Sequence, residues 1–340
     1  MMNLHCKLIC SIFLGTTGLL TIACEKKANS NHSDPIIHDR LTGREVSPDI
    51  DWSNIPSGEF IFGSSEDALC RAPIPEKEVA VTLTRPFHIA STEITQAQWE
   101  ALDIPNPALN RGEDKPVTFI NFFEAAIWCN KLSLLEGLEP CYNLISCHND
   151  FATGCDQSQE GAWHSCWDAD VNFNCTGDIH KYEDWYACPG YRLPTTAEWE
   201  YAAKAEVTAT RTYGGDVVGE GLGSCIDQPS LNDIAWYCSN STEELHPVGR
   251  KLPNPWGLYD TLGNVYEWTD YFSDGQPLDF ANPGQPLIDP IGPIDGEMKD
   301  LRGGAFNKAG CYVNPTWQFT DNPYTRRYDT GFRPVRTIFE

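Results

Sequence analysis

The chain has 340 residues, of which 41% are hydrophobic and 21% are charged, so it has enough apolar material to bury a sizeable core. Its 48 acidic residues outnumber 24 basic ones, which gives a formal net charge of -24. A field of that sign repels nucleic acid and anionic lipid head groups, which argues against nucleic-acid partners. Length alone is compatible with one large domain or two smaller ones.

The N-terminus has the features of an export signal. A positively charged start, Met1 to Lys7, precedes an apolar run, Leu8 to Ile22, that is short for a membrane span and ends at Cys24. We expect a signal peptide over residues 1–23. The stretch from Leu20 to Cys24 is similar to a bacterial lipoprotein signal, in which Cys24 becomes the lipidated first residue. Cleavage to a soluble exported protein and a retained anchor helix remain alternatives. Residues 24–51 are polar and predict a flexible linker.

Short strands and capped helices follow from residue 52 onward. Residues 58–63 and 79–83 have strand patterns, and we expect residues 87–89 to continue the second strand. Capping boxes predict helices that begin after Thr95, Asn121 and Thr195. Gly137 is expected to end the second of these helices. Long Gly- and Pro-rich stretches between the elements predict an α+β domain over residues 52–340 with much irregular structure.

Fourteen cysteines are typical of a protein that matures under oxidising conditions. Eight are disulfide candidates, because the sequence contains no metal-type spacing of paired cysteines or histidines. Six of them lie in a Cys-rich insertion, residues 141–188, and allow fifteen pairings; the other two are a plausible local pair. The insertion holds Cys141, Cys147, Cys155, Cys166, Cys175 and Cys188, and the local pair is Cys225 and Cys238. Cys70, Cys129 and Cys311 remain, so at least one thiol should be free if Cys24 is acylated.

Four segments, in order, resemble the formylglycine-generating enzyme (sulfatase-modifying factor) family. They are residues 91–99 (STEITQAQW), residues 115–130 with their Trp-Cys-Asn end, residues 191–203 (YRLPTTAEWEYAA) and residues 256–268 (WGLYDTLGNVYEW). Arg302-Gly303-Gly304-Ala305 and a terminal Gly331-Phe332-Arg333 complete the series. The resemblance covers nearly the whole domain. It implies a disulfide-rich, irregular α+β fold similar to C-type lectins, with little regular secondary structure and bound calcium.

The resemblance also implies a calcium site in the fourth segment. The family binds the ion through two side chains and two main-chain carbonyls, which correspond here to Asp260, Gly263, Val265 and Glu267. Calcium prefers six to eight hard oxygen ligands, and a glycine-containing turn can direct carbonyls inward. In the alternative interpretation, Asp260 caps a turn and Glu267 pairs with an arginine.

The residues for the family's chemistry are incomplete. Family enzymes oxidise a cysteine of a sulfatase segment to formylglycine, using oxygen and a copper(I) ion held by two cysteines after a Gly-Gly-Ser turn. Here Ala305 replaces the serine, residues 306–310 contain no cysteine, and Cys311 is the single thiol near the second position. Pro334 stands where catalytic members have a further cysteine. One thiol cannot form a copper pair, so a buried thiol or disulfide partner is the favoured role for Cys311.

The sequence therefore predicts a monomeric, calcium-stabilised lipoprotein of the bacterial envelope, in the periplasm or at the cell surface. It would contact a membrane through its N-terminal anchor and bind a protein or glycan ligand without catalysis. One alternative is a formylglycine-generating oxidase centred on Cys311, which alone would require copper. Another is a carbohydrate or peptide binder that uses Trp163, Trp167 and Trp185. A metal-dependent oxygenase is disfavoured, because the eight histidines show no i, i+4 pair.

Overall fold

The computed structural model describes residues 10–14, 20–24, 47–66, 68, 70, 78–144, 147–149, 151, 165–166, 173–175, 179–205, 224–273, 278, 284–293 and 295–339. The chain divides into two units, Met1–Arg44 and Glu45–Glu340. In the first unit, strands β1 (Cys10–Leu14) and β2 (Leu20–Cys24) pair antiparallel. Among the described residues, no helix has both the length and the apolar character needed to cross a membrane. The remainder of the expected signal peptide and linker up to residue 46 lies outside the described residues.

Three small sheets form the framework of the second unit. The first has the strand order β13-β12-β10-β15, the second β11-β5-β4 and the third β16-β6-β3. Their strands are β3 (Trp52–Ile55), β4 (Gly58–Phe62), β5 (Val79–Leu83), β6 (Phe87–Ala90), β10 (Tyr266–Phe272), β11 (Leu287–Ile288), β12 (Lys299–Arg302), β13 (Phe319–Asp321), β15 (Thr330–Gly331) and β16 (Val335–Thr337). Two further ladders, β14 (Arg326–Arg327) with β8 (Ser165–Cys166) and β7 (Cys147–His148) with β9 (Asn174–Cys175), involve the Cys-rich insertion.

The three α-helices of the described residues begin where the capping boxes predicted them. They are α1 (Gln96–Glu100), α2 (Phe122–Leu135) and α3 (Thr196–Lys204), with N-caps Thr95, Asn121 and Thr195. In each case the cap side chain accepts from the third helical N–H, and the side chain at that position binds the cap's own N–H. Gly137 follows α2 at a φ of 72°. Short 3-10 helices η1 (Trp185–Ala187) and η2 (Gly310–Tyr312) complete the elements.

The prediction that residues 87–89 continue the strand over 79–83 was wrong. Strand β5 pairs with β4 and β11, whereas β6 pairs with β3 and β16 in another sheet. The chain changes sheet at residues 84–86, where Asp289 accepts hydrogen bonds from the backbone N–H and the side-chain hydroxyl of Thr84. A proline at position 86 cannot donate to a ladder, which is consistent with a strand that ends here.

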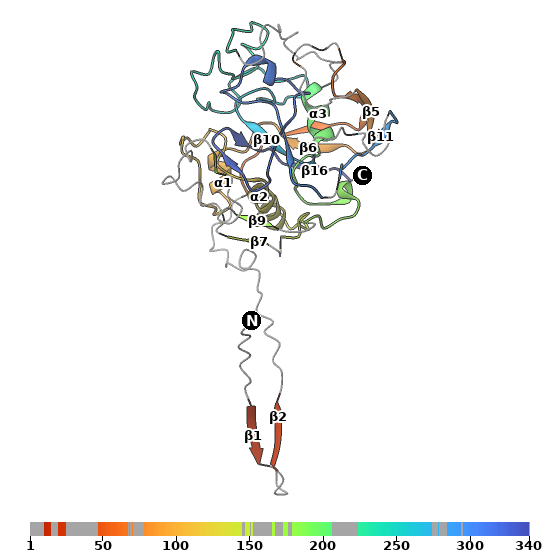
Figure 1. Cartoon of the computed structure of the whole chain (residues 1–340), viewed down its shortest axis with the longest axis vertical. Helices are drawn as coiled ribbons and strands as arrows, with labels where there is room; N and C mark the ends of the chain where they lie inside the picture. The colour runs from red at the N-terminus through yellow and green to blue at the C-terminus, as the bar shows by residue number, and fades with distance from the viewer. Residues whose placement is uncertain are drawn as a thin grey trace. The chain divides into compact units, whose positions relative to one another are not determined.

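Helices and sheets enclose a core that contains charged as well as apolar side chains. In the view of Figure 1, β6, β10 and β16 lie near the middle of the unit, with α2 below them and α3 above. Phe332 packs edge to face against Trp99 and Trp128 at the centre. Among the described residues, four arginines are fully buried, and each lies within 2.5–3.3 Å of an acidic side chain: Arg192–Glu198, Arg302–Glu200, Arg326–Glu124 and Arg333–Glu267. Paired burial of this kind joins segments that have few regular hydrogen bonds between them.

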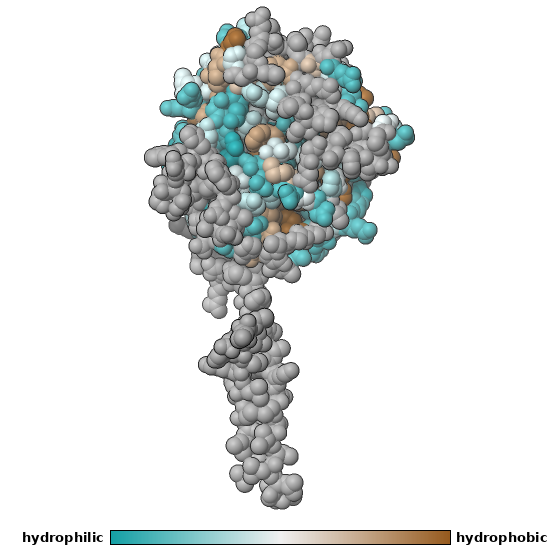
Figure 2. Space-filling view, viewed as in Figure 1, coloured by the Kyte–Doolittle hydropathy of each residue, from teal (hydrophilic) through white to brown (hydrophobic). Residues whose placement is uncertain are grey.

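The described part of one face of the molecule is largely hydrophilic. On the face shown in Figure 2, hydrophilic residues surround smaller hydrophobic patches. The large hydrophobic side chains that are exposed, such as Leu252 and Ile288, are spread over separate parts of the sequence. The α+β fold with short elements, much irregular chain and several disulfides is the architecture that the sequence predicted.

Candidate functional site

A double-glycine bend ends β12 and positions the segment that carries Cys311. Gly303 and Gly304 have φ values of 89° and 78°, which side chains rarely allow. A Cβ atom on Gly304 would lie 2.6 Å from the carbonyl oxygen of Tyr312, and one on Gly303 would lie 3.1 Å from that of Thr261. The bend is therefore packed between η2 and the loop after residue 260. Both glycines are required by backbone conformation and by space.

Cys311 forms a disulfide with Cys70, 241 residues earlier in the chain. Its side chain is buried, with 7% of the residue exposed. A disulfide sulfur is neither a thiolate nor a copper(I) ligand, so the arrangement does not fit an oxidase centred on Cys311. Among the cysteines whose side chains the structure describes, Cys129 is free, and burial raises the pKa of its thiol well above the usual value. It is fully buried within α2 and far less reactive than an exposed thiol.

A pocket of about 420 Å³ opens beside this segment. Its walls come from Tyr266 on β10, Lys308, Tyr312 at the end of η2, Trp317 and residues 318–320 around β13. The rings of Tyr312 and Trp317 meet at right angles with centroids 4.7 Å apart, and Tyr266 stacks on Phe319 at 5.4 Å. In the antiparallel pair of β10 and β12, Glu267 is opposite Arg302, so Tyr266 lies beside the double-glycine bend that follows Arg302. Glycine has no side chain, and the ring of Tyr266 can therefore reach across β12 to Phe319.

Three polar groups in this aromatic pocket have no hydrogen-bond partner in the described part of the chain. They are the hydroxyls of Tyr266 and Tyr312 and the indole N–H of Trp317. Tyr266 and Trp317 are only 2% and 6% exposed, yet their polar atoms are not sealed from solvent. A ligand that displaced water without replacing its hydrogen bonds would lose about 1–3 kcal/mol per stranded group.

The charges at the pocket are balanced. The Nζ atom of Lys308 lies 3.1 Å from a carboxylate oxygen of Asp329, and the other oxygen accepts a hydrogen bond of 2.9 Å from Arg327. Burial would raise the pKa of Asp329, but these two cations outweigh burial and lower it. Asp329 therefore stays ionised, and the carboxylate of Asp321 lies 3.3 Å from Arg327, so two acidic groups balance the two cations. The pocket presents polar hydrogens and aromatic rings rather than a net charge.

The expected calcium residues lie in a buried cluster around Arg333. Both carboxylate oxygens of Glu267 are 2.7 Å from guanidinium nitrogens of Arg333, and one also accepts the indole N–H of Trp199. One carboxylate oxygen of Asp260 accepts the backbone N–H of Gly249 at 2.6 Å. These contacts are those of the alternative interpretation, in which Asp260 caps a turn and Glu267 pairs with an arginine. Gly263 and Val265 are buried beside them, on the loop that leads into β10.

Glu93 joins this cluster and was missed in the sequence analysis. It is fully buried, and neither of its carboxylate oxygens has a hydrogen-bond partner; the second oxygen of Asp260 also has none. Burial, followed by the nearby Asp260 carboxylate, raises the pKa of Glu93 well above its usual value, and burial raises that of Asp260 to about 6. Three buried, unpartnered acidic oxygens suit a hard cation. The described residues include no group of three or more Asp, Glu, His or Cys side chains arranged to hold a metal ion.

The disulfides of the Cys-rich insertion fix its two ends. Cys141 bonds Cys188 and Cys147 bonds Cys175, while Cys225 and Cys238 form the local pair. The whole of Cys155, with the side chain of Cys166, lies outside the described residues, as do Trp163 and Trp167. Trp185 is 1% exposed and stacks on the His180 ring at 4.1 Å. Its ring therefore packs inside the insertion and offers no binding face.

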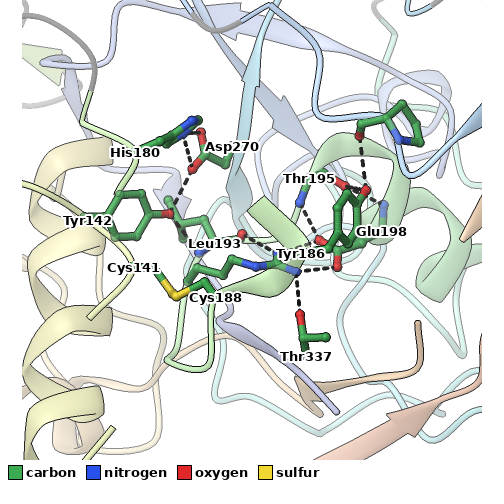
Figure 3. Close-up of polar contacts among 12 residues, drawn as sticks. Cys141, Tyr142, His180, Tyr186, Cys188, Leu193, Thr195, Glu198, Asp270 and Thr337 are labelled. Carbon is green, nitrogen blue, oxygen red and sulfur yellow. Dashed lines mark hydrogen bonds and ion pairs between the residues drawn. A yellow bond between two sulfur atoms is a disulfide. The ribbon is translucent and has the colours of Figure 1, made fainter. Parts of the chain in front are cut away.

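A buried polar network connects the insertion to the sheet (Figure 3). The carboxylate of Asp270 on β10 accepts the hydroxyl of Tyr142 at 3.0 Å and lies 3.0 Å from the His180 ring nitrogen. It also lies 2.6 Å from Nζ of Lys299. The Tyr142 oxygen in turn accepts the backbone N–H of Leu193. Each member binds another segment of the chain, so the network serves to anchor the insertion.

Comparison with known proteins identifies relatives along the whole second unit. The sequence profile of the sulfatase-modifying factor enzyme 1-like domain matches residues 41–338. A formylglycine-generating enzyme from Streptomyces coelicolor is 28% identical over 308 residues, which cover 87% of this chain and 88% of that protein. A protein from Paenibacillus barcinonensis named chaperone protein LppX is 32% identical over 188 residues, 54% of this chain. The chain spans 61% of the length of that relative.

Solved structures share the same fold. Treponema denticola variable protein 1 aligns with a TM-score of 0.61 and 27% identity, over 84% of this chain and 95% of its own. PvdO from Pseudomonas aeruginosa aligns with a TM-score of 0.58 and 17% identity, over 87% of this chain and 97% of its own, which establishes similarity of fold alone.

Proposed function

Since the chain belongs to the sulfatase-modifying factor enzyme 1-like domain family, we propose that it is a non-catalytic member that binds a ligand in the bacterial envelope. The observation that carries this proposal is the Cys70–Cys311 disulfide. Copper(I) in this family's chemistry requires two thiolates, and the one cysteine beyond the double glycine is already bonded to another sulfur. The residues present do not fit copper, and no oxidation step is assigned to them.

The ligand site of the proposed module is the aromatic pocket beside η2, formed by Tyr266, Lys308, Tyr312, Trp317 and residues 318–320. Its volume lies within the range of roughly 300–1,000 Å³ that is usual for ligand pockets. Its rings supply contact area, and its unpartnered polar hydrogens supply orientation. The Paenibacillus relative carries the name of a chaperone, which supports a binding role for a domain of this kind.

We also propose a stabilising calcium ion at the Asp260 loop. Asp260 and Glu93 would contribute the unpartnered carboxylate oxygens, and Gly263 and Val265 remain the expected main-chain ligands. Glu267, the fourth expected ligand, is occupied by Arg333, so Glu93 is the better candidate for the second acidic side chain. A divalent ion there would neutralise buried charge and lock the loop that leads into β10, which would stabilise the fold without taking part in a reaction.

Export and lipid anchoring complete the proposal. Disulfides persist in oxidising compartments, and four of them occur among the described residues. The apolar run before Cys24 supports lipidation at that residue, with the polar stretch over residues 25–51 as a tether. Mass spectrometry of the mature protein tests this part: an N-terminal Cys24 bearing acyl chains is expected, and a native N-terminus at another residue would contradict it.

The decisive test of the non-catalytic role is an activity assay. The purified protein is incubated with copper(I), oxygen and a sulfatase-type Cys-x-Pro-x-Arg peptide, and the peptide is examined by mass spectrometry for conversion to the aldehyde. We expect none in the protein as purified, because both sulfurs are held in the Cys70–Cys311 disulfide and neither is free to bind copper(I). Copper-dependent conversion that is lost in Cys311→Ser would overturn the proposal.

A further inference from the structure

The aromatic pocket combines apolar walls with polar hydrogens that have no partner. Tyr266, Tyr312 and Trp317 each contribute a ring and one such group, and Phe319 contributes a ring alone. A purely hydrocarbon ligand would cover the rings but strand the two hydroxyls and the indole N–H. A fully polar ligand would satisfy those groups but gain nothing from the rings. The occupant must have an apolar face and hydroxyl or carbonyl groups on the same small body.

The charges around the pocket further narrow the class of ligand that it can bind. Lys308 and Arg327 share Asp329, and Arg327 also pairs with Asp321, so two carboxylates balance the two cations and the pocket has no spare cation for an anionic ligand. The chain as a whole carries a formal net charge of -24, which repels anions at a distance. A cationic ligand would find no unpaired carboxylate among the residues that line the pocket. The electrostatics therefore favour a neutral ligand.

From these observations we infer that the pocket binds a neutral sugar, with a pyranose ring stacked on the aromatic rings that line the pocket and its hydroxyls bonded to Tyr266, Tyr312 and Trp317. A pyranose has C–H groups on its faces and hydroxyls around its rim, which is the combination that the walls require. The volume of about 420 Å³ is confined to one bend and the end of one sheet, which suits a short oligosaccharide better than an extended peptide. This inference rests on the proposed binding function, because it names the ligand class of the same pocket.

The test uses the full chain and a defined panel of neutral probes: N,N′,N″-triacetylchitotriose, maltotriose and cellotriose. Binding is measured by isothermal titration calorimetry and by tryptophan fluorescence. We expect at least one probe to bind with one site per chain. Trp317→Ala should weaken it at least tenfold, and Tyr266→Phe about three- to tenfold, the loss of one hydrogen bond. Tyr182→Phe, a tyrosine of the Cys-rich insertion, should leave affinity unchanged.

Two outcomes overturn the inference. One is the absence of binding for all three probes at millimolar concentration; the other is sugar affinity that Tyr266→Phe and Tyr312→Phe leave unchanged, since these conservative variants keep the fold and would place the sugar elsewhere. If the first outcome is accompanied by capture of an unstructured peptide that depends on Trp317, the proposed binding function still holds. Aldehyde formation in the peptide assay would instead defeat the proposed function itself, so the two failures are distinguishable.

Discussion

At the scale of single residues, the partners of a buried charged group decide whether that group stabilises the fold. Asp270 is fully buried and contacts Tyr142, His180 and Lys299. Burial would raise its pKa, but the opposing effect of His180 and Lys299 is larger and holds the pKa below its usual range. Glu93 has no comparable partner, and its pKa moves in the opposite direction. Acidic side chains in one core therefore make opposite contributions to stability.

Replacement of Asp270 with Asn should destabilise the protein by about 3–5 kcal/mol at pH 7, because it removes one charge from a buried pair. A carboxyl whose pKa is lowered on folding stabilises the protein above its unfolded pKa, and this contribution is lost as pH falls through the folded value. The deficit of Asp270→Asn should therefore shrink below about pH 4. Urea unfolding at pH 7 and pH 3 measures it. Asp114→Asn, from an exposed ion pair, is the control and should change stability by less than about 1 kcal/mol.

The effect of Glu93→Gln on thermal stability should depend on whether calcium is present. In EDTA the variant should unfold at a higher temperature than the wild type, because it removes an unpartnered buried carboxyl. In millimolar calcium the wild type should gain stability and the variant should gain less, since it lacks one ligand. Thermal unfolding in both buffers makes the comparison, with the exposed Glu113→Gln as control. Equal calcium responses in Glu93→Gln and wild type would remove Glu93 from the site.

At the scale of elements, local signals were readable from sequence and distant pairings were not. Thr95, Asn121 and Thr195 predicted three helix starts because a capping box involves residues only three apart. The separation of β5 from β6 depends on partners elsewhere in the chain, and so does the bond between Cys70 and Cys311. The aromatic pocket is a further case, because it joins β10 to β13 through the double-glycine bend.

The two disulfides near this bend should differ in their contribution to stability. In the chain-entropy model, a bridge closing about 240 residues restricts the unfolded chain more than one closing about 13, roughly 5 against 3 kcal/mol. The double variant Cys70→Ser and Cys311→Ser should therefore lower the urea midpoint more than Cys225→Ser with Cys238→Ser. The first variant should also lower the affinity of the pocket for its ligand, because Tyr312, which lines the pocket, adjoins Cys311 in η2. Equal effects on stability would mean that native-state packing, rather than loop closure, sets the cost.

At the scale of the whole molecule, the sequence predicted fold and family with little error, because the four resembling segments span the domain. The candidate site was harder to predict, since it depends on which oxygens and hydroxyls remain without partners after folding. Nothing in the residues around Glu93 distinguishes a buried, unpartnered carboxylate from an exposed one. The sequence likewise does not distinguish Trp317, whose indole N–H lacks a partner, from Trp185, whose ring is enclosed.

The overall acidic charge leads to a prediction of its own. A chain with a formal net charge of -24 repels itself in the compact state, and dissolved salt screens that repulsion over about 10 Å at 0.1 M. The melting temperature should therefore rise between 10 mM and 300 mM sodium chloride. Differential scanning calorimetry measures this, with equal osmolarity of sucrose as a control for solvent effects. A fall in melting temperature would mean that salt-sensitive attractive pairs outweigh the repulsion.

The third sheet has a mechanical consequence. Strands β3 and β16, close to the two ends of the domain, both pair antiparallel with β6, so they run parallel to each other on its two sides. The start of β3 meets Ala90 at one end of β6, and the end of β16 meets Phe87 at the other. A pull on the two ends of the domain would load these ladders in shear. Their hydrogen bonds would then have to rupture together rather than unzip one by one, which would make the fold resistant to force along the chain.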